Sequence, residues 1–339
     1  MKAAVLRDFK KPLAIEEVDP PKLGATDVLI RVEACGVCHS DVHVADGDWP
    51  EFARIVKKPL ILGHEIAGRV AERGAAVRDL AVGDRVGVPW LHWSCSECEF
   101  CREGNENLCV KQLITGVMVD GCYAEYVKAP ASHATKVPDA LSSEQAAPLF
   151  CAGVTVYRAL KGANLAPGQR LAVMGIGGLG HLAVQIGREM GAQVTAVDIS
   201  EEKLELGKAC GATDMVNASA KDAMKALRER GGFHAVLVTS AAKAAYEMAF
   251  YSLRPSGSLL AVGLPAEPIC FPPILMAARE ARIRATAVGT RQDLREVLAL
   301  AAAGKVRCRI ATHPLADADE LLNQLRQGRI SARAVLQMQ

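Results

Sequence analysis

Four cysteines lie close together in the chain, as Cys95, Cys98, Cys101 and Cys109, with the spacing C-x2-C-x2-C-x7-C. Four thiolates gathered around one point fill the tetrahedral coordination of a zinc ion completely. Such a site leaves no position for a substrate, so the spacing predicts a structural zinc site in a lobe of residues 93–110. Two disulfides, or four unrelated thiols, are the alternative interpretation.

A second group of possible metal ligands is spread over three parts of the sequence. Residues 38–43 (CHSDVH), which we expect to form a short loop, combine a thiol, imidazoles, a hydroxyl and a carboxylate. Residues 63–65 (GHE) add another histidine and glutamate, and Cys151 follows much later. Two cysteines and one histidine are a ligand set of catalytic zinc sites, in which the remaining position is open to water or substrate. Any of these residues alone is more often a buried thiol or a core histidine.

Residues 175–180 (GIGGLG) fit the pattern G-x-G-x-x-G directly after the apolar segment 170–174. Glycines at these positions allow a tight turn, a close approach of the backbone to a pyrophosphate, and close packing of the helix on the strand. The N-terminus of the helix then offers unpaired N–H groups to the phosphates. The pattern and its context predict a dinucleotide site.

Asp198 ends the next expected strand, 193–198, about 20 residues after the glycine motif. A carboxylate at this place accepts hydrogen bonds from ribose hydroxyls and repels a 2′-phosphate, so NAD is favoured over NADP. Lys203, one helical turn further on, is a candidate for another ribose contact. Asp198 is alternatively a cap for the helix expected from residue 201, and the two roles are compatible.

Composition restricts the class of protein. The 339 residues are enough for two domains, and half of them are hydrophobic. The 40 Lys and Arg nearly balance the 38 Asp and Glu, which argues against a nucleic-acid or membrane-surface partner. No apolar run reaches the roughly 18 residues of a membrane span.

Eleven cysteines without a secretory signal indicate a cytoplasmic protein with reduced thiols. We therefore expect buried, free thiols at Cys35, Cys122, Cys210, Cys270 and Cys308.

The elements that must position these residues fall into two patterns. Before residue 150, short β-rich stretches at 27–33, 66–72, 84–88 and 123–127 predict an irregular β-barrel-like domain with long loops. After residue 165, strands and helices alternate, which predicts a doubly wound parallel sheet. The expected strands are 170–174, 193–198, 235–239, 258–262 and an apolar 283–288, and the expected helices are 178–190, 201–209, 219–230, 242–252 and 292–303.

The tail from residue 306 onward is expected to contain short strands and turns that close back onto the first domain. The first domain is then discontinuous, with residues 1–152 and 289–339, and residues 153–288 form the second. The segment 258–262 is a candidate edge strand, although nothing in its residues distinguishes it from an interior one.

Taken together, the motifs resemble the zinc-dependent medium-chain alcohol dehydrogenases. Residues 63–77 fit the family signature G-H-E-x2-G-x5-G-x2-V at every fixed position, and the motifs occur in the family's order over the whole chain. The compact length and the surroundings of Trp49 and Trp90 are most similar to the tetrameric ethanol-type enzymes of yeast and bacteria. The resemblance implies a GroES-like catalytic domain, a Rossmann domain, two zinc ions, NAD and a homotetramer.

The resemblance also implies roles around the catalytic zinc. Cys38, His64 and Cys151 would bind the ion. Asp41 would hydrogen-bond the ring of His64 and so orient it. Glu65 would lie beside the metal and act as a transient ligand during water exchange.

A proton relay and a substrate channel follow from the same resemblance. Ser40 would take the proton of the alcohol, and His43 would pass it to solvent through the ribose of the cofactor. Trp49 and Trp90 would narrow an apolar channel, which favours primary alcohols and admits flat benzylic or furan alcohols. Both tryptophans are alternatively core aromatics of the barrel.

Cofactor contacts are implied at further positions. His39 stands where the family has a pyrophosphate-binding basic residue, often arginine, so phosphates would be held less firmly and release would be faster. Arg333 matches a second pyrophosphate contact. The remaining positions expected around the nicotinamide, ribose and phosphates are Thr155, Gly175, Gly177, Gly178, Leu179, Gly180, Asp198, Lys203, Val262, Gly263 and Leu264.

The implied reaction is reversible hydride transfer between a primary alcohol and NAD, with zinc acting as a Lewis acid. Polyol dehydrogenases often have a carboxylate where Cys151 stands, and zinc-free quinone reductases lack both cysteine sets. A non-catalytic zinc-ribbon scaffold would explain the cysteines of the lobe but leaves Ser40 and His43 without a purpose.

Overall fold

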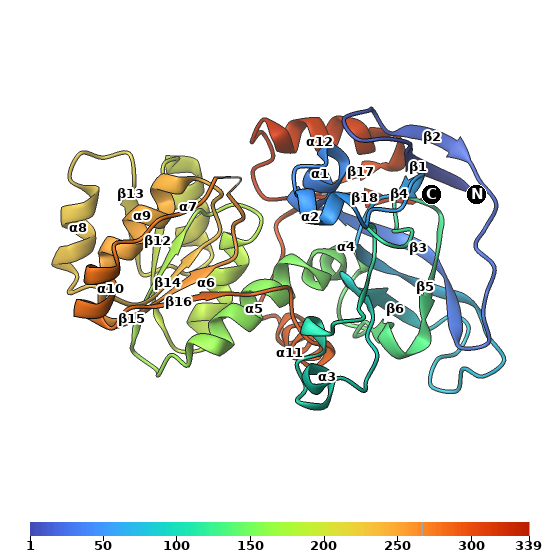
Figure 1. The fold of residues 1–339 in the computed structure, drawn as a ribbon, viewed down its shortest axis with the longest axis horizontal. Coiled ribbons are helices and arrows are strands. Elements are labelled where there is room, and N and C mark those ends of the chain that lie inside the picture. The colour runs from blue at the N-terminus through green and yellow to red at the C-terminus, as the bar shows by residue number, and fades with distance from the viewer. Residues whose placement is uncertain (266, 339) are drawn as a thin grey trace. The chain divides into compact units, whose positions relative to one another are not determined.

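The computed structural model describes residues 1–265 and 267–338, without the side chain of Glu51 (Figure 1). Within these residues the chain forms two compact units. The first unit consists of Met1–Cys151, Thr290–Gly304 and Cys308–Gln339, and the second of Ala152–Gly289 and Lys305–Arg307. No helix in the described ranges is long and apolar enough to cross a membrane.

The first unit is organised around the long strand β3 (Asp27–Val37). β3 pairs antiparallel with β5 (Glu65–Arg73) along most of its length. On its other side it pairs antiparallel with β9 (Tyr126–Pro130) near its start and with β18 (Arg333–Gln337) near its end. The sheet continues through β6 (Arg85–Val88) to β10 (Thr135–Lys136), and on the other side from β18 to β17 (Ile310–Pro314). A smaller sheet has the order β2 (Ala14–Glu17), β1 (Lys2–Leu6), β4 (Leu60–Ile61).

Two helices of this unit differ from the expectations. Residues 38–43 were expected as a loop, but residues 39–43 lie in the helix α1 (His39–Asp46), and Cys38 is its N-cap residue. The tail, expected as strands and turns, contains the helix α12 (Ala318–Arg326) between β17 and β18. Its buried residues Ala318, Leu321, Leu322 and Leu325 recur at helical spacing and pack into the core of the first unit. The longer helix α11 (Arg291–Ala302) also belongs to this unit. Short helical segments complete it: α2 (Pro50–Ala53), η2 (Ala131–His133), α4 (Ser143–Ala146), η3 (Ala147–Phe150) and η4 (Leu315–Asp317).

The cysteine lobe is built from very short elements. A two-stranded ribbon pairs β7 (Leu91–Trp93) with β8 (Leu113–Ile114), and between them lie α3 (Glu99–Arg102) and η1 (Glu106–Leu108). Ion-pair and hydrogen-bond contacts of Arg291 attach the lobe to the rest of the unit: the guanidinium binds Glu106 at 2.9 Å and the carbonyl of Ser132 at 2.8 Å.

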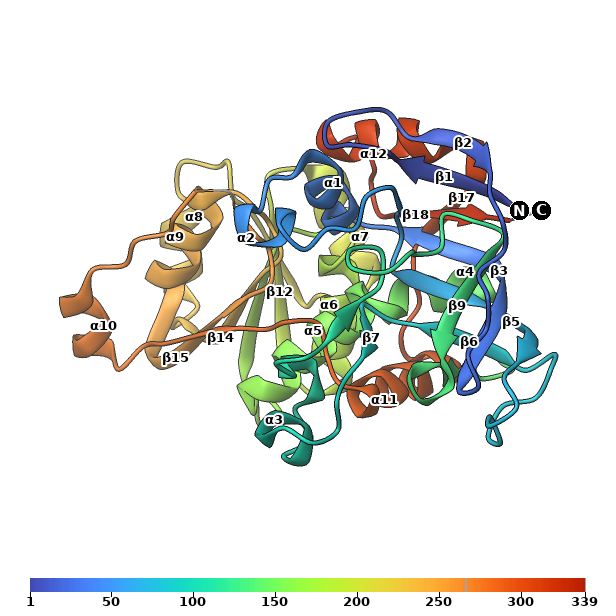
Figure 2. The same cartoon turned by 45° about the vertical axis from the view of Figure 1, so that its right-hand side comes forward.

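The second unit is a parallel sheet of the order β13-β12-β11-β14-β15-β16, the arrangement 3-2-1-4-5-6 of a Rossmann fold. Figure 2 shows α5 and α6 on one side of the sheet and α8 and α9 on the other. The strands are β11 (Arg170–Met174), β12 (Gln193–Asp198), β13 (Asp214–Asn217), β14 (Phe233–Val238), β15 (Leu253–Ala261) and β16 (Arg282–Ala285). The helices are α5 (Ala152–Ala163), α6 (Gly180–Glu189), α7 (Glu201–Ala209), α8 (Ala223–Glu229), α9 (Lys243–Ser252) and α10 (Pro273–Arg279).

Three details of this sheet correct the sequence analysis. The strand β13 was not expected. The strand expected at 283–288 is the edge strand β16, and its residues are exposed instead of forming an apolar core strand. The segment 258–262, weighed as an edge, belongs to β15 and lies between β14 and β16. The sequence pattern of a short strand does not determine which strands it pairs with in the sheet.

The cysteines outside the metal motifs also differ from the expectation of buried free thiols. Cys35 and Cys122 are joined by a disulfide, which links β3 to the segment before β9. Cys270 is exposed and Cys210 is half-buried, whereas Cys308 is a buried free thiol as expected. The two cysteines are 87 positions apart in the sequence, so the sequence does not reveal that they are close in space.

The glycines of the turn between β11 and α6 have different structural roles. Gly175 has a φ of 93°, which favours glycine. A Cβ on Gly180 would stand 1.8 Å from the carbonyl oxygen of Gly175, whereas a Cβ on Gly177 would meet no described atom within 4 Å. Gly180 is therefore required for folding of the turn, and Gly177 leaves open the space that a pyrophosphate would approach.

We predict that Gly180→Ala impairs stability, whereas Gly177→Ala impairs NAD binding. Gly180→Ala should lower the free energy of unfolding by about 1–3 kcal/mol, because the backbone of the turn must shift. Gly177→Ala should change stability by less than about 0.5 kcal/mol but weaken NAD binding. Denaturant unfolding and calorimetric titration with NAD⁺ measure the two effects. Similar destabilisation of both variants would contradict this interpretation of the turn.

Candidate active site

The carboxylate of Asp41 organises a buried cluster in the first unit. Cys38 is the residue before α1, and its backbone N–H donates to Asp41 Oδ2 at 2.9 Å. The other oxygen, Oδ1, lies 2.9 Å from Nδ1 of His64, which stands just before β5. The hydroxyl of Tyr123 donates to Oδ2 at 3.1 Å. Asp41 and His64 are each 1 % exposed, so this carboxylate connects three distant segments in a dry interior.

These contacts leave one side of the His64 ring ready to bind a metal. An ionised carboxylate only accepts hydrogen bonds, so Nδ1 is the donor to Asp41, and Nε2 is the ring atom left to bind a metal on losing its proton. Nε2 is buried and has no hydrogen-bond partner among the described residues. A ligand atom from each of Cys38, His64, Glu65 and Cys151 lies within 4.8 Å of the others. The unpartnered nitrogen and the two thiols fit a zinc ion.

The electrostatics of the cluster favour a cation. A hydrogen bond from Cys151 lowers the pKa of the Cys38 thiol well below its usual value, so Cys38 is readily a thiolate. Burial is the largest single effect on the pKa of His64 and lowers it, but the charges and hydrogen bonds of Asp41 and Cys38 together outweigh burial and raise that pKa well above the usual value. The lowered pKa of Cys38 and the raised pKa of His64 both indicate a pocket that stabilises positive charge.

Glu65 is paired within the protein. It is the first residue of β5, and its Oε2 accepts from the guanidinium of Arg333, the first residue of β18. Burial raises the pKa of Glu65 to about 7, even though the positive charge of Arg333 opposes the rise. Its other oxygen, Oε1, is buried and has no partner among the described residues, so it is available near the metal cluster. The sequence analysis did not anticipate this pair, and a phosphate contact of Arg333 stays a prediction.

Strand β3 leaves room for this pair at Gly36. A Cβ on Gly36 would lie 1.8 Å from Glu65 Oε2, and Gly36 is the register partner of Glu65. Val37, the next residue, is paired with Ala334 of β18. The register of β3 therefore places Glu65 and Arg333 together near Cys38.

The two expected relay residues lie on the accessible side of α1. Ser40 and His43 are three residues apart and share a face of the helix, whereas Asp41 points into the core. His39 is exposed one turn before His43, with 6.4 Å between the ring centroids. The helix thus separates the residue that orients the metal ligand from the residues that face outward.

A row of aromatic rings connects the metal cluster with the relay histidine. Trp90 meets the ring of His64 edge-on at 4.9 Å between centroids. Phe52 lies between the tryptophans, 6.4 Å from Trp90 and 5.5 Å from Trp49. Trp49 stacks on His43 at 4.6 Å. Phe52 was missed in the sequence analysis, where it was one of several aromatics without a motif.

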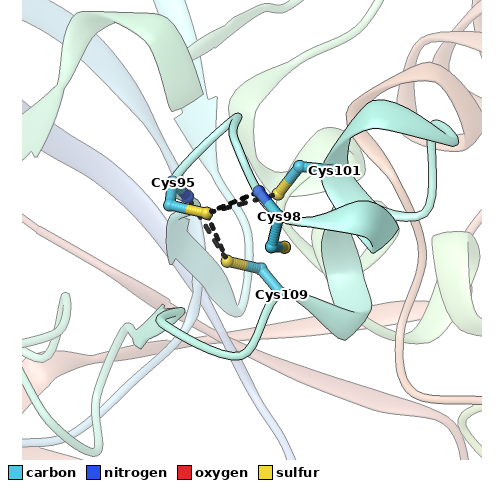
Figure 3. Close-up of side chains that lie close together, drawn as sticks. All are labelled: Cys95, Cys98, Cys101 and Cys109. Carbon is cyan, nitrogen blue, oxygen red and sulfur yellow. Dashed lines mark hydrogen bonds between the residues drawn. The ribbon is translucent and has the colours of Figure 1, made fainter.

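Figure 3 shows the four thiols of the lobe turned toward one another. Sγ of Cys95 is 3.5 Å from that of Cys109 and 4.0 Å from that of Cys101, and ligand atoms of all four cysteines lie within 4.8 Å. Backbone N–H groups, chiefly those of Glu97 and Cys98, lower the pKa of Cys95 to about 6. No disulfide is formed among these cysteines, and their arrangement fits a closed zinc site.

The dinucleotide motif in the second unit is held by Asp198. Its Oδ2 accepts from the backbone N–H of Ile176, inside the glycine turn, at 2.7 Å, and its Oδ1 accepts from the N–H of Ser200 at 3.1 Å. Asp198 therefore supports the glycine turn and the backbone before α7, but it is not the cap of that helix, because the N-cap residue is Ser200. Its role toward a ribose stays a prediction.

The other expected cofactor positions lie on several elements. Gly263 follows β15, and a Cβ there would stand 2.3 Å from the carbonyl oxygen of Ser240. Leu264 is 51 % exposed, and Lys203 on α7 is half-buried. The remaining positions are buried or half-buried at strand ends, in the glycine turn or in a first helical turn: Thr155, Gly175, Gly177, Gly178, Leu179, Gly180 and Val262.

We predict that Tyr123→Phe weakens the catalytic metal site selectively. Loss of the hydroxyl leaves Asp41 less firmly placed, and loss of an outer partner of this kind lowers metal affinity about tenfold. Tyr126→Phe is the matched control. Metal content after dialysis against graded chelator should show earlier loss of one zinc ion from Tyr123→Phe alone. Equal retention by both variants would show that Tyr123 does not support the site.

Comparisons with known proteins agree with this geometry. Residues 24–139 match the model of the alcohol dehydrogenase GroES-like domain, and residues 178–303 match that of zinc-binding dehydrogenases. An alcohol dehydrogenase of Geobacillus stearothermophilus is 48 % identical over 339 residues, with all of both chains covered. One from Rhizobium meliloti is 45 % identical, with 100 % of this chain and 99 % of that protein covered.

Solved structures show the same relationship. The alcohol dehydrogenase of the archaeon Aeropyrum pernix superposes with a TM-score of 0.92 at 37 % identity, covering 99 % of this chain and 100 % of that one. Acetophenone reductase from Geotrichum candidum, solved with NAD, gives 0.89 at 30 % identity, covering 99 % and 96 %. The expected GroES-like and Rossmann architecture is confirmed. The chain belongs to the zinc-dependent alcohol dehydrogenases of the medium-chain dehydrogenase family.

Proposed function

We propose that the protein oxidises primary alcohols to aldehydes with NAD⁺, reversibly, as an alcohol dehydrogenase with one catalytic and one structural zinc ion. The observation that carries this proposal is the unpartnered Nε2 of His64 among the thiols of Cys38 and Cys151. That arrangement provides three protein ligands, and a zinc ion held in this way can accept an alcohol at its remaining position.

The chain's own residues divide the work between binding and proton transfer. Cys38, His64 and Cys151 would hold the zinc ion, which as a Lewis acid makes the hydroxyl of the alcohol more acidic. The hydroxyl of Ser40 accepts the released proton and gives up its own proton in return. His43, three residues further along α1, carries the proton toward solvent. Asp41 keeps Nδ1 of His64 protonated, so that Nε2 stays directed at the metal.

The second unit supplies the expected dinucleotide site. The open space at Gly177 and the start of α6 would admit a pyrophosphate. The carboxylate of Asp198 lies at the end of β12, where it favours a free ribose hydroxyl and disfavours the phosphate of NADP. We therefore assign NAD as the cofactor that accepts the hydride.

The aromatic row supports a preference for small or flat primary alcohols. Trp49, Phe52 and Trp90 make an apolar wall between His64 and His43, and such a wall leaves little room for a second substituent on the reacting carbon. A planar benzylic or furan alcohol can lie against these rings.

We further propose a cytoplasmic homotetramer. The free thiols of the four-cysteine lobe favour a reducing compartment, although disulfides such as Cys35–Cys122 are rare there, and the family resemblance supports the assembly. Analytical ultracentrifugation of the zinc-loaded protein tests the assembly directly, and a monomer across micromolar concentrations would exclude it.

We predict that purified protein forms NADH from NAD⁺ and primary alcohols, and that activity falls as a chelator removes zinc from the catalytic cluster. Two zinc ions per chain should be present before treatment. His64→Ala should retain the lobe's zinc ion and lose most of the activity. Full activity of a metal-free preparation would refute the proposed chemistry.

We predict that the protein prefers ethanol and benzyl alcohol over 2-propanol, and that Trp90→Ala reduces this preference about tenfold by opening the wall. Trp93→Ala, which changes a tryptophan of the neighbouring ribbon, is the control. Steady-state kcat/KM for the three alcohols gives the comparison. A wild-type preference for 2-propanol would show that the wall does not exclude a second substituent.

A further inference from the structure

Asp48, just after α1, holds the side chain of His43. Asp48 Oδ2 lies 3.1 Å from His43 Nδ1. We propose that Asp48 is a positioning residue for proton transfer: it fixes the ring of His43 and its Nδ1–H tautomer, so that Nε2 faces outward as the proton acceptor. This inference rests on the proposed function, because it concerns the relay of that reaction.

The turn after α1 attaches Asp48 to His43 at two points. Gly47 ends the helix with a φ of 67°, a left-handed conformation that favours glycine. The turn brings the backbone N–H of Asp48 to the carbonyl oxygen of His43 at 3.1 Å. Asp48 therefore binds both the backbone and the ring of His43. A single contact would leave the carboxylate free to swing away, whereas the two together define its direction.

The chemistry of the contact selects one tautomer. A carboxylate at neutral pH has no proton to donate, so Nδ1 of His43 must be the donor in this hydrogen bond. In the neutral ring the proton is then on Nδ1, and Nε2 keeps its lone pair. An unconstrained imidazole favours the opposite tautomer, in which Nε2 carries the proton and cannot accept another. The contact with Asp48 thus keeps Nε2 of His43 free of a proton, so that Nε2 can accept one from the relay.

Trp49 restrains the same ring from its face. The indole stacks on His43 with 4.6 Å between centroids and 29° between planes. Stacking limits tilting of the imidazole, while Asp48 limits its rotation about the Cβ–Cγ bond. Adjacent residues of one turn therefore control both motions. His43 keeps 19 % of its side chain exposed, which leaves it a path to solvent.

A second carboxylate near the end of α1 has a different partner. Asp46 binds the guanidinium of Arg326 on α12, with contacts of 2.7 and 2.9 Å. Asp46 and Asp48 are close in sequence and carry the same charge, yet the carboxylate of Asp46 is bound to Arg326 and that of Asp48 to His43. Asp46→Ala is therefore a matched control that removes a carboxylate from this helix end without removing the contact to the ring.

The tautomer is tested by ¹⁵N NMR of zinc-loaded protein labelled at its histidine side chains, at about pH 8.5, where an ordinary histidine is neutral. His43→Gln removes one set of signals and so assigns His43. We expect the Nδ1–H tautomer in the wild type and in Asp46→Ala, and a shift toward Nε2–H in Asp48→Ala. The Nε2–H tautomer in the wild type, or no change in Asp48→Ala, would overturn the inference.

A kinetic cycle separates positioning from general loss of structure. Asp48→Ala should lower kcat about 3- to 10-fold, because the contact is partly exposed and its effect is moderate, while KM for NAD⁺ changes less than about twofold. Asp48→Asn should be intermediate, since its amide oxygen can still accept from Nδ1. In a His43→Gln background, Asp48→Ala should have no further effect. An equal loss in both backgrounds would contradict the proposal.

The outcomes distinguish this inference from the proposed function. If the wild type oxidises no alcohol, the proposed reaction fails, and the NMR measurement still decides whether Asp48 sets the tautomer. If the wild type is active but Asp48→Ala matches Asp46→Ala in tautomer and kcat, the reaction stands and the positioning role of Asp48 fails.

Discussion

The buried carboxylate of Asp41 is the interaction on which the catalytic cluster depends. It binds the backbone before α1, the ring of His64 and the hydroxyl of Tyr123. A buried charge is stable only when its hydrogen bonds are made, so these segments must come together for the carboxylate to be tolerated. Asp41 therefore couples folding of the first unit to the orientation of a metal ligand.

Strand β3 provides the frame for this arrangement. It is paired on both sides at its end, and it leads directly into Cys38 and α1. Gly36 leaves space for the carboxylate of Glu65, whose charge is balanced by Arg333. Breaking one member of a buried pair of this kind leaves an uncompensated charge, which is strongly destabilising. The end of β3 is thus a place where stability and chemistry rest on the same residues.

Helix α1 connects the two halves of the chemistry. Its inner face presents Asp41 to the metal ligand, and its outer face presents Ser40 and His43. The period of 3.6 residues per turn is what allows neighbours in sequence to serve opposite sides. A loop, as first expected for this segment, would not hold the two faces at a defined angle. The turn after the helix then adds Trp49 and its neighbouring carboxylate to the outer side.

The sequence alone determined which elements and residue types the protein would have. Strands β11 and β12 were predicted with their observed bounds, because a buried parallel strand is a continuous apolar run. The four-cysteine lobe and the glycine turn were identified because their spacing is local and their chemistry is specific. Helix α12 was missed although its apolar positions recur at helical spacing, because the whole tail was interpreted as short strands and turns. Strand β13 was missed because a run of four residues carries little periodicity.

Only the tertiary structure decided which distant residues meet. The pairing of Glu65 with Arg333, the contact of Tyr123 with Asp41 and the disulfide between Cys35 and Cys122 join residues far apart in the chain. Such contacts depend on the register of β3 with its neighbours, and a register is set by packing over the whole sheet. The chain therefore encodes its ligands locally, while their partners are selected by the fold.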